Sequence, residues 1–128
     1  MNYGKKVWVV PDGYLPVLPP DQKEDPEVYF SHESTCIINL TDKDAKVRFT
    51  VYFEDKDPVE IENITVGAKR SNHVRMERLL ENGNSIIGRG NPYSLLVESS
   101  EPVVVQMSRL DTTQDNMAFL ATMAYPLD

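Results

Sequence analysis

The stretch AKVRFTVYFE, residues 45–54, alternates apolar and polar side chains at every position but one. Ala45, Val47, Phe49, Val51 and Phe53 occupy every second position, so they share one face of an extended chain. This alternation is typical of a strand with one face on a hydrophobic core and the other toward solvent. We therefore predict a half-buried strand over residues 45–54.

The preceding residues predict a partner for that strand. Residues 34–40 are rich in β-branched and apolar side chains, and residues 41–44 read Thr-Asp-Lys-Asp. Short Asp and Thr side chains bond the local backbone and favour turns. The two strands are expected to pair as a hairpin.

Further short strands are predicted on both sides. The candidates are Lys5–Val10, Val59–Val66, His73–Leu79, Ser94–Glu98, Val103–Leu110 and part of Met117–Tyr125, separated by turn signals at Asp57-Pro58, Asn82-Gly83, Gly88–Pro92 and Ser99–Pro102. Some seven or eight short strands without helical periodicity indicate an all-β fold, an antiparallel sandwich or barrel.

Two segments do not follow this pattern. Residues 112–123 contain good helix formers after a capping residue, so local propensity favours a helix there. Residues 11–26 hold five of the nine prolines and several acidic residues. Because proline fixes φ and removes a backbone donor, we predict a surface loop at about 11–26.

Length and charge restrict the classes of function. A chain of 128 residues suits a single domain, and a net charge of -7 opposes general binding to nucleic acid or to anionic membranes. No apolar run approaches the roughly 20 residues that cross a bilayer, and the polar start does not resemble a signal peptide. We expect a cytoplasmic protein. The single cysteine, Cys36, excludes an internal disulfide and a zinc site of several thiolates.

One basic segment interrupts the acidic chain. Residues 63–80 hold Lys69, Arg70, Arg75 and Arg78 against one acidic residue, Glu77. In a strand, Ser71, His73 and Arg75 would share a wholly polar face. Such a face suits a carboxylate, a phosphate or sugar hydroxyls, but a solvated face with cross-strand ion pairs is the more common arrangement and is favoured on composition.

Other candidate sites are weaker. His32 and His73 with Glu33 could suit a metal, but adjacent strand residues point to opposite faces, so we expect no metal site. Cys36 lies in an apolar run and is expected to be a small core residue. Trp8 suits a core position better than a stacking platform for a sugar ring.

Three blocks of sequence closely resemble the family of the soluble transducer of Anabaena sensory rhodopsin. They are Phe30–Asn39 (FSHESTCIIN), Gly67–Arg75 (GAKRSNHVR) and Pro102–Asp111 (PVVVQMSRLD), and the similarity runs from about Trp8 to Tyr125. The resemblance implies a single domain over residues 1–128, a β-sandwich of jelly-roll character, that assembles as a cytoplasmic homotetramer. It also implies a final strand rather than a helix near the C-terminus.

Members of this family are regarded as small-molecule-binding domains, with sugars or sugar-like compounds as the favoured ligands and no established catalysis or cofactor. The resemblance places the family's polar pattern on His32, Glu33, Arg70, His73, Arg75, Gln106, Arg109 and Asp111, to which Trp8 adds a candidate stacking face. The leading hypothesis is a non-enzymatic sensor of a sugar or sugar acid. Alternatives are a transducer that docks on a membrane sensory rhodopsin or another protein, a DNA-contacting cofactor that uses the basic segment, and a metal-dependent enzyme of cupin-like shape.

Overall fold

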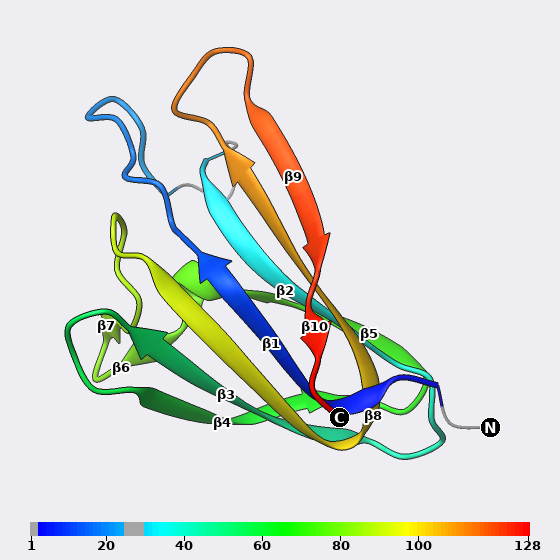
Figure 1. Cartoon of the computed structure of the whole chain (residues 1–128). Coiled ribbons are helices and arrows are strands. Elements are labelled where there is room, and N and C mark those ends of the chain that lie inside the picture. Colours follow the sequence, from blue (N-terminus) through cyan, green and yellow to red (C-terminus); the bar gives the residue numbers. More distant parts are fainter. Residues whose placement is uncertain (1–2, 25–29) are drawn as a thin grey trace.

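The computed structural model describes residues 3–24 and 30–128, which form strands joined by turns and loops, with no α-helix among them (Figure 1). The elements are β1 (Lys5–Gly13), β2 (His32–Asn39), β3 (Ala45–Phe53), β4 (Val59–Val66), β5 (Arg70–Arg75), a 3-10 turn η1 (Met76–Arg78), β6 (Leu80–Glu81), β7 (Asn84–Ser85), β8 (Tyr93–Asp111), β9 (Ala118–Met123) and β10 (Tyr125–Pro126). The expected all-β, single-domain antiparallel fold is confirmed. Within these residues no helix has the length and apolar character that a membrane span requires.

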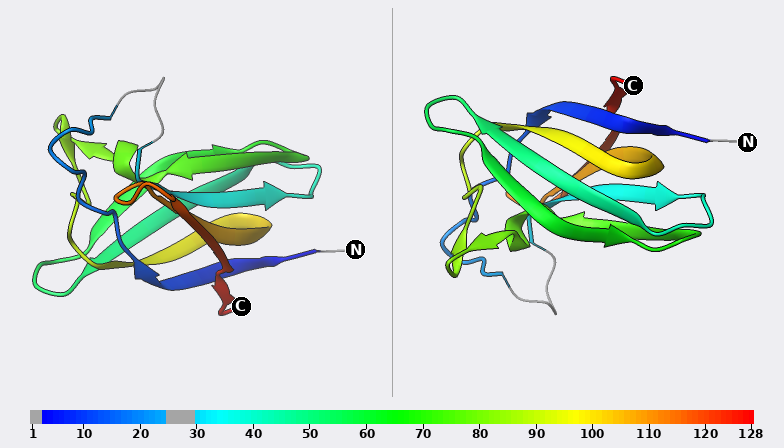
Figure 2. Two further views of the ribbon diagram at one scale, coloured as in Figure 1. Left: turned by 90° about the horizontal axis from the view of Figure 1, so that it is seen from above. Right: turned by 90° about the horizontal axis from the view of Figure 1, so that it is seen from below.

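Two layers are joined by the long strand β8. Its first half pairs with β1 and β3, giving the layer β10-β1-β8-β3-β4, and its second half pairs with β2 and β9, giving the layer β5-β2-β8-β9. All these pairings are antiparallel. The layers face each other in the views of Figure 2. Because β8 belongs to both, it sets their relative position.

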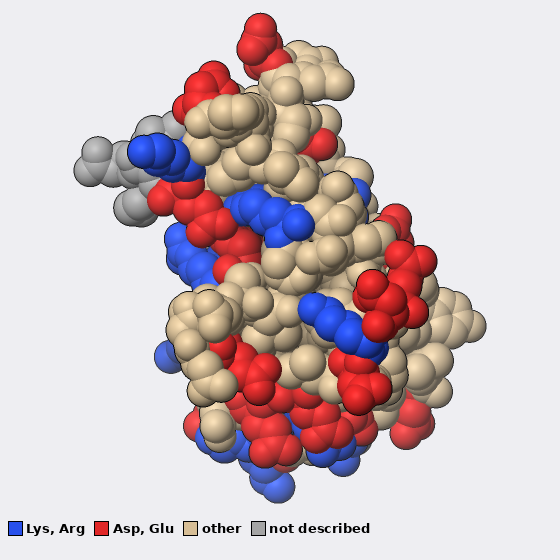
Figure 3. Space-filling model, turned by 90° about the vertical axis from the view of Figure 1, so that its left-hand side faces the viewer, with Lys and Arg blue, Asp and Glu red and all other residues tan. Residues whose placement is uncertain are grey.

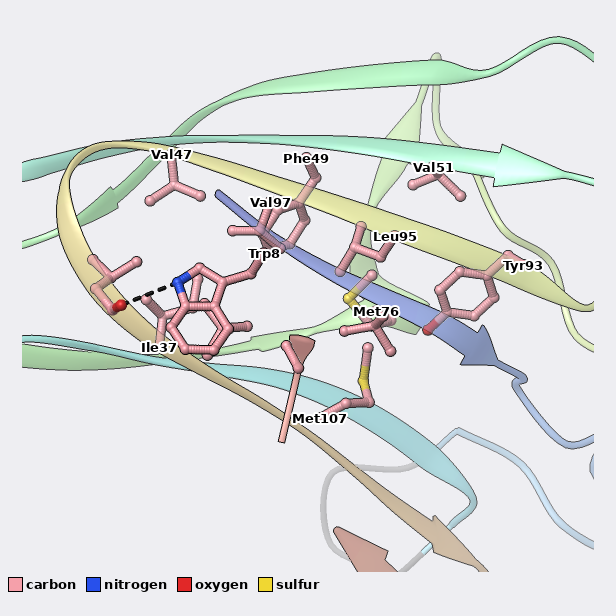
Figure 4. Packing of buried hydrophobic residues seen from close by; sticks show 14 of the residues in the cluster. Trp8, Ile37, Val47, Phe49, Val51, Met76, Tyr93, Leu95, Val97 and Met107 are labelled. Atoms are coloured by element: carbon pink, nitrogen blue, oxygen red, sulfur yellow. Dashed lines mark hydrogen bonds between the residues drawn. The ribbon is translucent and has the colours of Figure 1, made fainter. Parts of the chain in front are cut away.

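The core lies between the layers and follows the period-2 pattern of the sequence. On β3, Ala45, Val47, Phe49 and Val51 are buried, and β8 adds alternate residues along both of its halves. Trp8 is buried among these side chains, near Ile37 and Val97 (Figure 4). Its indole Nε1 donates hydrogen bonds to the carbonyls of Lys5 and Val103, at 3.0 and 3.1 Å. The preference for a core position is therefore confirmed.

The predicted hairpin of residues 34–40 with 45–54 is wrong. β2 pairs with β5 and β8, whereas β3 pairs with β4 and β8 in the other layer. The connecting turn crosses between the layers around Asn39, which is fully buried and whose side-chain amide donates to the carbonyls of Lys43, Val66 and Gly67 at 2.7–3.2 Å. Turn residues indicate a reversal of direction, but they do not determine whether the two strands pair.

Two other strand boundaries also differ from the prediction. Residues 99–102 were expected to form a turn, yet β8 continues through them as a bend. The strand expected at His73–Leu79 ends at Arg75 and is followed by η1, so that Met76 and Glu77 become buried.

Asn82 and Gly83, with φ of 52° and 80°, form the expected turn within a small hairpin, β6-β7. The C-terminal segment forms strand β9, as the family resemblance implied and against its helical propensity.

The proline-rich segment is only partly a surface loop. β1 extends to Gly13, and Leu15 and Pro16 are buried against the sandwich. Residues 25 and 26 of the predicted loop lie outside the described residues. The backbone N–H of Gly90 donates to the carbonyl of Leu15 at 2.8 Å, so this segment and the β7-β8 loop lie together at one end of the sandwich (Figure 2).

Candidate functional site

A buried carboxylate organises this end of the sandwich. Glu33, on the inward face of β2, is fully buried and lies directly across from Arg109 on β8. Its Oε2 accepts a hydrogen bond from Arg109 Nε at 2.9 Å, and its Oε1 accepts from the Tyr93 hydroxyl at 2.6 Å and from the Tyr14 backbone N–H at 3.0 Å. Two of the predicted site residues therefore form an internal ion pair.

Burial and hydrogen bonding act in opposite directions on this carboxyl group. Loss of hydration raises the pKa of Glu33 above its usual value, while the hydrogen bonds from Tyr93, Tyr14 and Arg109 offset part of that rise. Burial beside Glu33 also raises the pKa of Tyr93, so its hydroxyl remains a donor. The group is thus held in place on three sides and has the character of a structural anchor.

A second carboxylate lies nearby, at the end of β5. The Glu77 side chain is 2 % exposed, and its Oε2 lies 2.6 Å from Nη2 of Arg75. Neither carboxylate oxygen has a well-directed hydrogen bond among the described residues. The Arg75 guanidinium also lies over the ring of Phe30, 5.4 Å from its centroid. Arg75 is therefore an ion-pair partner of a buried acid, as the alternative reading of the basic segment allowed.

Arg89 connects the loops at this end of the sandwich through hydrogen bonds. Its Nη1 donates to the carbonyls of Pro16 and Ser31 at 2.9 and 2.8 Å, and its Nε and Nη2 donate to Glu24 at 3.0 and 2.8 Å. These contacts join the β1-β2 segment to the start of β2 and to the β7-β8 loop. The glycine-containing stretch Gly88–Asn91 therefore has a structural role, because it positions Arg89 for these contacts.

Three predicted residues meet instead on the outer face of the layer β5-β2-β8-β9. The strand register places Arg75, Ser34 and Ser108 in one row, and His73, Cys36 and Gln106 in the next. We call these six residues the polar grid. Ser34 is only 7 % exposed although it faces outward, because larger neighbours surround it. The grid is thus a polar patch whose middle strand, β2, carries the small side chains of Ser34 and Cys36.

The prediction for Cys36 is wrong. It was expected in the core, but Thr35 and Ile37 take the inward positions of β2 and leave Cys36 half-buried in the polar grid. Its Sγ lies 3.9 Å from the Ser108 hydroxyl oxygen. An apolar run does not reveal which of its residues face the core when both faces of a strand are partly covered.

Of the remaining predicted site residues, His32 and Asp111 lie at the adjoining ends of β2 and β8, whereas Arg70 lies at the opposite end of the layer. Arg70 is exposed at the start of β5 and donates to the carbonyl of Lys69 at 3.1 Å. His32 begins β2, where its Nδ1 lies 2.9 Å from the Phe30 carbonyl. Asp111 ends β8, and its Oδ1 accepts from the Thr113 N–H and hydroxyl at 2.9 and 2.6 Å. In the described residues no group of three potential ligands is arranged for a metal ion.

The surface does not form a continuous basic field. Lys69 pairs with Asp42 at 3.1 Å, which offsets part of the charge of the basic segment. On the face drawn in Figure 3, acidic and basic side chains lie beside one another. This arrangement gives no support to a DNA-contacting role.

Sequence reasoning missed Tyr14, Glu77, Arg89 and Tyr93, which build the sandwich end. Glu77 had one signal, because it is the only acid within the basic segment. The other three become recognisable only when the loops and the start of β8 are brought against β2, which local sequence does not specify.

Comparison with known proteins agrees with this architecture. The family model for the Anabaena sensory rhodopsin transducer matches residues 3–126. The crystal structure of Thermotoga maritima 1070 is similar with a TM-score of 0.81 and 36% identity, covering 97% of this chain and 96% of that one. The Anabaena sensory rhodopsin transducer itself is similar with a TM-score of 0.69 and 34% identity, covering 84% and 96% of the two chains. Among proteins of curated function, none matches the chain in sequence.

Proposed function

Because the chain belongs to the Anabaena sensory rhodopsin transducer family, we propose that it is a cytoplasmic, non-enzymatic signal-transducing domain that binds a sugar or sugar acid. The observation that carries the proposal is the polar grid, where His73 and Gln106 flank Cys36 on adjacent strands. Both side chains are outside the internal ion pairs that engage Arg75 and Arg109.

The chemistry of the grid suits a polyhydroxylated ligand. Imidazole, amide and hydroxyl groups donate and accept hydrogen bonds, as sugar hydroxyls also do. Small side chains at the centre allow a flat molecule to approach the backbone of the sheet. The partly exposed guanidinium of Arg75 stands at the edge, where a carboxylate of a sugar acid would gain a charge-assisted hydrogen bond.

A panel of sugars, sugar acids and sugar phosphates should raise the melting temperature selectively. At one hundred times its Kd, a ligand adds about 2.7 kcal/mol, equivalent to several degrees for a domain of this size. We expect the shift to disappear in the His73→Ala, Gln106→Ala double variant and to persist in Gln114→Ala, which removes an exposed glutamine elsewhere. A flat panel on a folded protein would reject sugar binding. The native mass of the same preparation gives the oligomeric state of the protein.

We also propose that four copies assemble into a homotetramer, as the family resemblance implied. Among the described residues, β4 pairs only with β3 and β9 only with β8, so each strand leaves one edge unpaired. Open edges are sites where another chain can add. A native mass equal to that of a monomer would contradict this assembly.

Docking on a membrane sensory rhodopsin is a second candidate function. Half of the twelve large hydrophobic residues that are exposed in the described chain lie near its C-terminus, namely Met117, Phe119, Leu120, Met123, Tyr125 and Leu127. Acidic residues accompany them, including Asp111, Asp115 and Asp128. An apolar strip with an acidic border fits a receptor segment that carries apolar and basic side chains.

Phe119→Lys should weaken binding to a sensory rhodopsin held in bilayer discs by about tenfold or more, because it places a charge in the apolar strip. Wild-type binding should also weaken as salt rises from about 0.05 to about 0.5 M. Val17→Lys provides a matched control, since Val17 is an exposed apolar residue in the β1-β2 segment. An equal loss of affinity in both variants, or an affinity that does not change with salt concentration, would count against this docking mode.

A further inference from the structure

A hollow of about 500 Å³ lies beside β3, on the layer opposite the polar grid. β3 contributes Lys46 and Arg48, β4 contributes the stretch from Glu62 to Thr65, and β8 contributes Glu98 and Ser99. A volume of this order is within the range of small-molecule sites in proteins. None of the candidate site residues predicted from the sequence lines it.

A bulge in β4 shapes this hollow. Val47 pairs with Ile64, but two residues further along Phe49 pairs with Ile61, so Glu62 and Asn63 together oppose Arg48. Asn63 takes a φ of 68°, a conformation that asparagine tolerates better than most residues. Bulges redirect side chains and interrupt strand pairing. Here the bulge places Glu62 opposite Arg48 rather than opposite Phe49, and no ion pair links Glu62 to Lys46 in the described chain.

Two charged groups in the hollow are only weakly engaged. Arg48 Nη2 contacts Glu98 at 3.0 Å, so those charges offset each other, whereas Glu62 is 3.8 Å from Arg48 Nη1 and its side chain is 65% exposed. Lys46 Nζ meets a neutral partner, the Thr65 hydroxyl, at 3.3 Å. The hollow therefore presents one available carboxylate and one available ammonium group. Arg48 stands between two acids and has a buried Nε without a partner.

We propose that this hollow binds a small zwitterion of the amino-acid type. The ligand ammonium would bind Glu62, and the ligand carboxylate would bind Lys46. Two acids and two bases leave the lining neutral, which disfavours a multiply charged phosphate, and the lining contains no aromatic ring on which a nucleobase could stack. The site is distinct from the polar grid, so it would add a second ligand to the proposed sugar-binding transducer.

Calorimetric titration with the twenty free amino acids, each up to about 10 mM, tests the site at the millimolar affinity expected for a small ligand. For any amino acid that binds, its N-acetyl derivative and its methyl ester lack one of the two charges. We expect both derivatives to bind at least about tenfold more weakly, and Lys46→Gln and Glu62→Gln to cause losses of the same size.

Matched variants locate the binding. Lys43→Gln and Glu60→Gln remove exposed charges near the hollow without altering its lining, and should bind as the wild type does. The His73→Ala, Gln106→Ala variant should also keep amino-acid binding, which separates this site from the sugar site. Absence of saturable binding by all twenty amino acids, or equal binding of the blocked derivatives, would overturn the proposal. Loss of sugar binding in Glu62→Gln would mean that the hollow binds a sugar and not an amino acid.

Discussion

Arg109→Ala is expected to lower the free energy of unfolding by about 3–5 kcal/mol, because it removes the cationic partner of a buried carboxylate. Glu33 is fully buried, and Arg109 Nε is the only positively charged donor among its hydrogen-bond partners in the described chain. Urea denaturation at neutral pH measures the loss. Arg48→Ala is the matched control, since it breaks the Arg48–Glu98 pair at the surface and should lower the free energy of unfolding far less.

The pH dependence of this loss follows from the raised pKa of Glu33. Without Arg109, the buried carboxyl is expected to hold its proton still more tightly in the folded protein than in the unfolded chain. Unfolding then releases a proton over the range between the two pKa values, so the variant loses stability as pH rises from about 4.5 through the folded-state pKa. The difference between wild type and variant should therefore be smaller near pH 4.5 than at about pH 8. If the difference in free energy of unfolding between wild type and variant does not change with pH, the ionisation of Glu33 is not its source.

Much of the fold could be predicted from local patterns. The alternation at residues 45–54 correctly gave the buried face of β3, and the short strands with their turns correctly gave an antiparallel all-β domain. Pairing between distant segments was not encoded in the same way. β2 joins β5 and β8 rather than its neighbour β3, and buried Asn39 stabilises the crossing turn through the carbonyl groups of Lys43 and Val66.

The candidate site shows the same division between local and distant information. The alternation of β5 correctly placed Ser71, His73 and Arg75 on one face, and only the register with β2 and β8 could bring Gln106 into one row with His73, on the other side of Cys36. Residue type did not distinguish a free arginine from a paired one. Arg75 and Arg109 are engaged by Glu77 and Glu33, which lie on other segments or become buried only through η1.

Trp8→Ala is expected to lower the free energy of unfolding by about 3–5 kcal/mol, the range for removing a large aromatic side chain from a core. Trp8 is 6% exposed and packs among residues from both layers. Its indole N–H also joins the start of β1 to the bend of β8 through the carbonyls of Lys5 and Val103. Urea denaturation, compared with Tyr52→Ala at an exposed position of β3, gives the measurement.

A conservative variant separates the core role of Trp8 from a stacking role in ligand binding. Trp8→Phe keeps an aromatic ring but removes both indole hydrogen bonds, so it should cost about 1–3 kcal/mol. Because the ring lies between the layers and the polar grid lies on an outer face, any sugar-induced shift in melting temperature should survive this substitution. Loss of the shift in a Trp8→Phe protein of nearly wild-type stability would instead mean that the indole contacts the ligand. The sandwich would then have to open between its layers to admit the sugar.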